Sequence, residues 1–245
     1  QTCALPIYGL HTWSERWAMQ FNIKKCKIMH FGSNNPKREY FMNGEKLQAT
    51  EEERDIGVLV TPNLKPGAQC RKAAAVTART VLGQIARAFH YRDRHVFLKL
   101  YTTYVRPHLE FATPAWSPWL LSNIECLESV QKKAAVDMIS GLRAKEYEGK
   151  LMELGLETLA TRREKADLVL ANKIINKTAS LDPLHWFELS DPDSGVTRAA
   201  SGPLHIIQKR CRLDTRKSFF TNRVAASWNR LLEAVRTAAL EKFKR

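Results

Sequence analysis

The stretch PGAQCRKAAAVTARTVLGQIARAF, residues 66–89, determines the helical character of this chain. Its apolar side chains recur at the spacing of one face of an α-helix, and Pro66 suits a first helical turn. The stripe consists of Cys70, Ala74, Ala78, Val81, Leu82, Ile85 and Phe89. The stretch therefore predicts a long amphipathic helix that buries this face.

Helical patterns continue toward the C-terminus. Asp93 is a suitable N-cap for a helix with an apolar stripe over 96–105, which Pro107 should kink or end. Ser122 and Glu125 have the spacing of a capping box at the start of a further helix. Two more helices are predicted over 156–174 and 220–231, on either side of a stretch rich in proline, glycine and basic residues.

The first sixty residues have a different pattern. Leu10–Phe21 places apolar residues on one helical face, and Cys26–Phe31 and Ile56–Val60 have the composition of strands. Tyr40–Leu47 centres on Asn43-Gly44, a strong signal for a two-residue hairpin turn. We expect a helix followed by a small antiparallel sheet, and hence an α+β protein that is mostly helical.

These patterns predict the following division of the chain. Residues 1–7 (QTCALPI) resemble the translation of a sequencing-adapter oligonucleotide, and we treat them as a foreign leader. The remainder divides into an α/β piece, a helical domain, a loop-rich basic linker and C-terminal helices: 8–62, 63–180, 181–217 and 218–245.

Charge is the most informative part of the composition. The 245 residues carry a net charge of +14, and residues 61–115 contain nine basic and only two acidic side chains. Such a concentration of one sign favours a polyanionic partner, and nucleic acid is the first to consider. Five dispersed cysteines suit a reducing compartment, and no membrane span or secretion signal is apparent, so we expect an intracellular protein.

No complete active site is visible in the sequence. Nucleotide-binding glycine loops, a zinc-protease motif and a nucleophile elbow are all missing, and the seven histidines are scattered. A freestanding hydrolase or oxidoreductase is therefore disfavoured, and no metal ligands are assigned.

Two cationic surfaces are candidates for binding a phosphate backbone. On an ideal helix, one face of the first long helix would carry a row of cations that ends in a glycine: Lys65, Gln69, Lys72, Arg79 and Gly83. A second candidate is the basic run that contains Arg210, Arg212 and Arg216. On pattern alone, an ordinary solvated face explains such a row about as well.

Several segments resemble LINE-type reverse transcriptases of the jockey-like, non-LTR group. FNIKKCKIMHFG (residues 21–32) resembles polymerase motif D, with Asn22 and Lys25 at its Asn and Lys positions. The hairpin at Asn43-Gly44 and RDIGVLV, which contains Gly57, resemble the primer-grip segment. Later segments resemble the family's thumb, in the same order: residues 97–118, 127–135, 141–143, 147–163 and 218–231.

The resemblance implies the end of a polymerase palm followed by a thumb, an RNA template and DNA primer duplex as partner, and nuclear or cytoplasmic location. The family's catalytic aspartates, which hold Mg²⁺, lie upstream of motif D and have no counterpart in these residues. We therefore expect a truncated RNA-directed DNA polymerase that binds duplex, needs no cofactor of its own and is inactive alone. By resemblance, Lys25 would approach a triphosphate. The alternative is a degenerate helical module that acts only through protein contacts.

Overall fold

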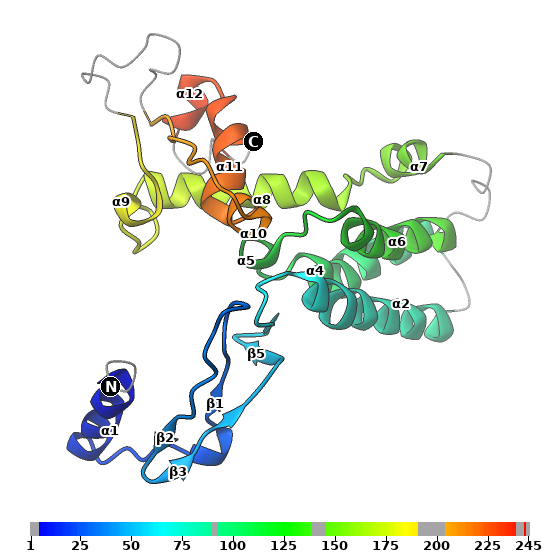
Figure 1. The fold of residues 1–245 in the computed structure, drawn as a ribbon. Coiled ribbons are helices and arrows are strands. Elements are labelled where there is room, and N and C mark those ends of the chain that lie inside the picture. The colour runs from blue at the N-terminus through cyan, green and yellow to red at the C-terminus, as the bar shows by residue number, and fades with distance from the viewer. Residues whose placement is uncertain (1–4, 90–92, 139–145, 191–203, 239–242, 244–245) are drawn as a thin grey trace. The chain divides into compact units, whose positions relative to one another are not determined.

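The computed structural model describes residues 5–89, 93–138, 146–190, 204–238 and 243 (Figure 1). The chain forms two compact units, residues 1–66 and 67–245, which are described separately below. All six strands of the described residues lie in the first unit, and helices dominate the second. The α+β class is confirmed. The second unit contains residues from three of the predicted segments, 63–180, 181–217 and 218–245.

The helix of the first unit differs from the expected one. α1 (Leu5–Arg16) begins inside the stretch that the sequence analysis set aside as a leader. It also stops earlier than expected, because Ala18 adopts a left-handed conformation with φ of 51° just after it. Trp13 and Trp17 are 44% and 60% exposed, so the apolar face expected over Leu10–Phe21 is not buried within this unit.

The strands form three separate pairs rather than the single antiparallel sheet that the sequence suggested. Two pairs are hairpins, whereas the third is parallel and joins segments 21 residues apart in the chain. Each strand has only two or three residues, too few to extend one ladder across all the segments. The pairs are β2 (Phe41–Met42) with β3 (Glu45–Lys46), β5 (Glu53–Asp55) with β6 (Val58–Val60), and β1 (Lys27–Ile28) with β4 (Gln48–Ala49).

Both hairpin turns have positive φ at their two central residues. Asn43 and Gly44 have φ of 51° and 79°, which confirms the hairpin predicted from that dipeptide. Ile56 and Gly57, at 44° and 83°, form the turn of the other hairpin. Ile56 is therefore not part of a strand, and its side chain is 89% exposed.

The second unit begins with a long helical segment. Residues 67 and 68 lead into η3, a π-helix (Gln69–Val76), which continues as α2 (Thr77–Ala88). The predicted stripe is confirmed over most of its length, since five of its members are buried. They are Cys70, Ala74, Ala78, Leu82 and Ile85, whereas Phe89 lies beyond the helix end and is 42% exposed.

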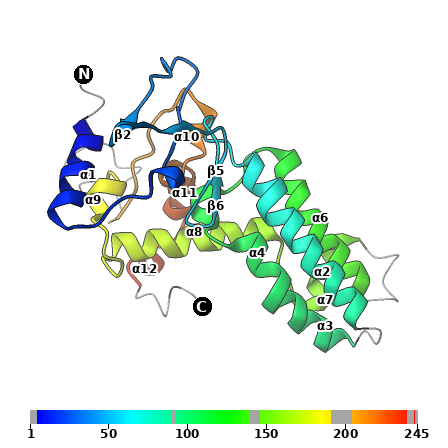
Figure 2. The same ribbon diagram turned by 90° about the horizontal axis from the view of Figure 1, so that it is seen from below.

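A second helical path packs beside the first (Figures 1 and 2). It runs through α3 (Arg94–Leu100), the π-helical η4 (Tyr101–Val105) and α4 (Arg106–Glu110). The Asp93 carboxylate accepts hydrogen bonds from the amides of His95 and Val96, so the predicted cap is confirmed. Pro107 does not end this path, because it lies in the first turn of α4, where a missing N–H is tolerated.

Two more helices complete this part of the unit. α5 (Thr113–Trp116) is a single turn, and α6 (Leu121–Met138) packs against η3 and α2. The predicted capping box is wrong, because Ser122 already lies inside α6. α7 (Tyr147–Leu154) follows residues 139–145, which lie outside the described part.

The C-terminal part is built on α8 (Leu159–Ile175), against which α11 (Phe220–Asn229) packs (Figure 1). Trp228 is fully buried at the centre of this cluster, with Phe220 and Val224 from the same helix. Three short helices complete it: α9 (Pro183–Trp186), α10 (Asp214–Lys217) and α12 (Glu233–Arg236). Of the helices in the described ranges, none is long and apolar enough to cross a membrane.

A buried hydrogen-bonded chain links four elements of this unit. The Tyr101 hydroxyl donates to Gln131 Oε1 at 2.6 Å, and Gln131 Nε2 donates to the Tyr147 hydroxyl at 3.0 Å. Tyr147 in turn donates to Glu128 Oε2 at 2.8 Å, and Glu128 Oε1 accepts from the backbone amide of Ala160. The polar groups of this core are thus paired through α6, α7 and the first turn of α8.

Candidate nucleic-acid interface

The long helical segment at 67–88 is the strongest candidate surface. Its buried side rests on α6, and its sequence contains four cations and no aspartate or glutamate: Arg71, Lys72, Arg79 and Arg87. The charged side chains of this helix are therefore all positive. Cations arranged in this way can neutralise the phosphates of a nucleic-acid backbone.

The row of cations predicted along this helix is only partly formed. Gln69 is 3% exposed and belongs to the interior. Arg79 lies against α6, where its Nη2 donates to Ser129 Oγ at 2.8 Å and to the carbonyl of Cys126 at 3.3 Å. Lys65 precedes the helix and belongs to the first unit.

Of the predicted face, Lys65, Lys72 and Arg79 are exposed and Gln69 is buried. The prediction assumed 3.6 residues per turn, whereas each i→i+5 turn takes about one residue more. Side chains beyond Gln69–Val76 are therefore rotated relative to those before it. Gln69, at the start of this π-helix, lies on the buried side, whereas Arg79 beyond it stays exposed while it bonds to α6.

A different row of residues is exposed on this helix. Lys72, Val76, Thr80 and Arg87 follow at steps of three or four residues, with Gly83 between the last two. A Cβ built at Gly83 meets no atom within 4 Å, so a ligand backbone has room there. The sequence reasoning missed Arg87, although its position four residues after Gly83 pointed to the same face.

The second basic segment is also exposed. Arg210, Arg212 and Arg216 are all on the surface, the first two on the segment that leads into α10 and Arg216 within that helix. The Arg216 guanidinium lies 5.2 Å from the centre of the Phe219 ring, and Asp214 interrupts the run of positive charge. This segment is therefore the weaker of the two candidates.

The motif D candidates lie at a short 3₁₀ helix of the first unit, η2 (Ile23–Lys25). Asn22 and Lys25 both have exposed side chains. The Asn22 carbonyl accepts from the Lys25 amide at 2.9 Å, and the Asn22 side chain makes no capping bond. Their approach to a nucleotide stays a prediction.

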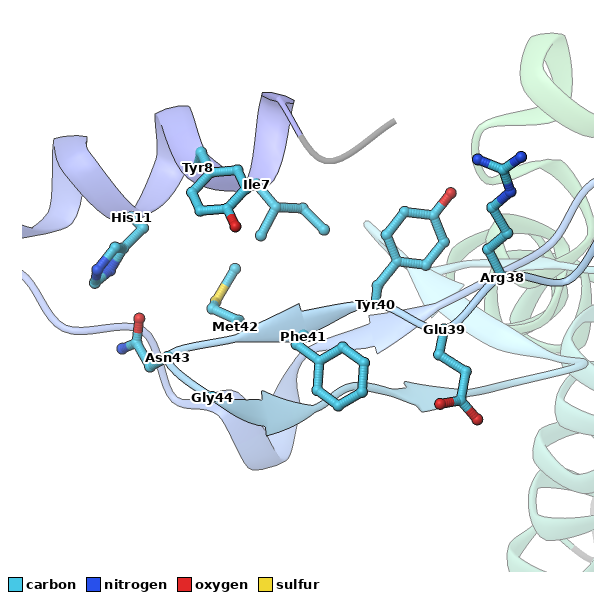
Figure 3. A pocket seen from close by; sticks show the side chains of 10 residues that line it. All are labelled: Ile7, Tyr8, His11, Arg38, Glu39, Tyr40, Phe41, Met42, Asn43 and Gly44. Atoms are coloured by element: carbon cyan, nitrogen blue, oxygen red, sulfur yellow. The ribbon is translucent and has the colours of Figure 1, made fainter. Parts of the chain in front are cut away.

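The primer-grip-like residues occupy the two hairpin turns described above. Asn43 and Gly44 also border a cavity of about 500 Å³ between α1 and β2. Figure 3 shows Met42 pointing into this cavity toward Ile7 and Tyr8, whereas Phe41 points away from it. Gly57 does not line this cavity. Holding a primer stays a prediction for all three residues.

No group of three or more His, Cys, Asp or Glu side chains in the described ranges is arranged to hold a metal ion. Comparisons with protein-family models, with curated proteins and with solved structures find no match.

Proposed function

We propose that this chain is part of an RNA-directed DNA polymerase of a non-LTR retrotransposon, and that it holds template–primer duplex. The ordered series of segments that resemble motif D, the primer grip and the thumb supports the family. No Tyr/Phe-Ala-Asp-Asp sequence occurs among the 245 residues, so the proposed role is duplex binding rather than polymerisation. The Mg²⁺ of the family is assigned to that missing motif.

The acid-free helix at 67–88 is the observation that carries this proposal. Lys72 and Arg87 are fifteen residues apart on its exposed side, which corresponds to about 20 Å. That length matches about six phosphates along one strand of a duplex. Gly83 lies between them, where a sugar-phosphate backbone can approach the helix closely.

A pair of double variants tests the proposal. Lys72→Gln with Arg87→Gln removes the two cations of the exposed row. Lys133→Gln with Lys165→Gln removes two exposed cations from α6 and α8 and serves as the matched control. The dissociation constant for an RNA–DNA duplex is measured between 50 and 200 mM salt, values chosen to span a strong salt effect.

Each lost phosphate contact should reduce the salt dependence of log K by about 0.9. We expect the Lys72/Arg87 variant to bind the duplex more weakly. The slope of log K against the logarithm of the salt concentration should decrease in magnitude by up to about 1.8, and sequence preference should not change. The control should lose much less. Equal losses in both variants would contradict the proposal and favour a module that acts through protein contacts.

A further inference from the structure

A second cavity lies inside the unit formed by residues 67–245, and the proposed function does not use it. It has a volume of about 220 Å³ and lies among α8, α11 and the segment that joins α5 to α6. Its polar lining comprises two arginines, two acidic residues and two serines: Arg163, Arg223, Asp167, Glu164, Ser117 and Ser227.

Both carboxylates of this cavity already have partners. Arg223 donates two hydrogen bonds to Asp167, at 2.7 and 2.8 Å, and also donates to the carbonyls of Pro114 and Ser218. Glu164 accepts a hydrogen bond from Ser227 and lies 3.8 Å from an Arg230 nitrogen. The two negative charges are therefore balanced by Arg223 and Arg230.

Arg163 is the remaining charged residue of the cavity lining. It is only 4% exposed, and its buried Nη1 has no hydrogen-bond partner among the described residues. Burial lowers the pKa of Arg163 below its usual range, although Glu128 and Asp167 exert an opposing attraction. A buried guanidinium nitrogen without a hydrogen-bond partner is costly, and a native protein keeps one only where something compensates it.

We propose that this cavity binds a phosphate-type oxyanion, with Arg163 supplying the charge and the Ser117 hydroxyl a further donor. Asp167 is paired with Arg223 and Glu164 lies beside Arg230, so Arg163 is the lining cation available to a singly charged oxyanion such as a phosphodiester or dihydrogen phosphate. A water molecule takes about 30 Å³ in the liquid, so the volume accommodates a phosphate group with ordered water. The inference does not depend on the function proposed for the helix at 67–88.

Phosphate binding is measured by ³¹P NMR titration of the 245-residue protein with inorganic phosphate, at constant ionic strength maintained with chloride. Wild type should show saturable binding. Arg163→Met should weaken it by at least about tenfold, because a charge-assisted bond to a buried cation is lost. Lys133→Met removes one exposed cation elsewhere and should leave the affinity unchanged.

Two results would overturn the site: no saturable binding to wild type, or equal affinity in wild type and Arg163→Met. If Arg163→Met does not fold, Ser117→Leu provides a second test, because it fills the cavity without changing charge and should also abolish binding. Retained affinity in a folded Ser117→Leu variant would count against the site.

Competition identifies the source of the oxyanion. A short oligonucleotide without terminal phosphates should displace inorganic phosphate if the site accepts an internal phosphodiester. If only a 5′-phosphorylated oligonucleotide competes, the site takes a phosphate monoester or free phosphate. Duplex affinity of the Lys72→Gln/Arg87→Gln variant is a separate readout, so the two proposals can fail independently.

Discussion

Arg223 and Asp167 form a bidentate pair across 56 residues of sequence, with Nε to Oδ2 at 2.7 Å and Nη2 to Oδ1 at 2.8 Å. The Asp167 side chain is 8% exposed and the Arg223 side chain 19%. Burial raises the pKa of Asp167, against the opposing effect of Arg223. The pair joins α11 to α8 at a mostly buried contact beside the second cavity, where either charge alone would be poorly solvated.

Removing one member of this pair should be strongly destabilising. Asp167→Ala leaves the Arg223 charge without its partner, and we expect a loss of about 3–5 kcal/mol in the free energy of unfolding. Urea denaturation gives the value. Glu188→Ala breaks the exposed Glu188–Lys209 pair and should cost less than about 1 kcal/mol. Similar losses in the two variants would show that burial does not set the strength of the first pair.

Because of Tyr101, the free energy of unfolding should decrease with pH in the alkaline range. Burial is the main cause that raises the pKa of the Tyr101 hydroxyl above its usual range. In the unfolded chain the tyrosine hydroxyl has a pKa near 10. Because the pKa is higher in the folded protein, the contribution of neutral Tyr101 to the free energy of unfolding is complete below about pH 10 and is lost as the pH rises above it. Tyr101→Phe should cost about 1–3 kcal/mol at pH 7, because Gln131 loses its donor, and this cost should shrink above pH 10.

Urea denaturation at pH 7 and at about pH 10.5 measures this change. Tyr104→Phe, at an exposed tyrosine of the same π-helical segment, is the control and should change little at pH 7. A Tyr101→Phe cost that is the same at both pH values would contradict the prediction.

Cys70 should be protected from thiol reagents. Its side chain is fully buried on the core side of η3, and burial raises its pKa to about 12. We expect Cys70 to react with N-ethylmaleimide at least about 100-fold more slowly than the half-buried Cys126 and Cys211. Mass spectrometry after a short pulse measures the order of labelling, with urea-unfolded protein as the control. Equal rates in the native protein would place Cys70 outside the core.

The strands of the first unit should exchange their amide hydrogens quickly. Each has at most three residues, and β3, β4 and β5 are exposed along their length. Short two-stranded pairs are marginally stable, so residues 26–60 should exchange faster than α2 and α6. Hydrogen exchange followed by mass spectrometry gives the comparison. Equal protection would mean that the short pairs are as stable as the helices.

Local signals predicted the parts of this fold that depend on neighbouring residues. Asn43-Gly44 specified its own turn, Asp93 its own cap, and the spacing of Cys70, Ala74 and Ala78 the buried side of the first helix. Each of these rests on backbone geometry or apolar spacing within a few residues.

The remainder depends on contacts between distant segments, which one sequence does not reveal. Arg163 and Asp167 are charged residues of α8, yet both are buried in contacts with elements distant in the sequence, such as the Arg223 of α11 that pairs with Asp167. Ser122 was misread as a cap, since the start of α6 depends on the preceding turn rather than on that side chain. In the candidate interface, no sequence pattern indicated the π-helical turns at Gln69–Val76 or the burial of Gln69.

If the i→i+5 turns of Gln69–Val76 are kept, removing a single residue from this segment shifts the side chains of residues 67–71 by one helical position, about 100°, relative to α2. Cys70 would leave the core, and Arg71 would lose its hydrogen bond to Asn123. Length is thus more tightly constrained here than residue identity. Natural variants of this chain should exchange side chains in this segment while keeping the number of residues between Gly67 and Leu82 constant.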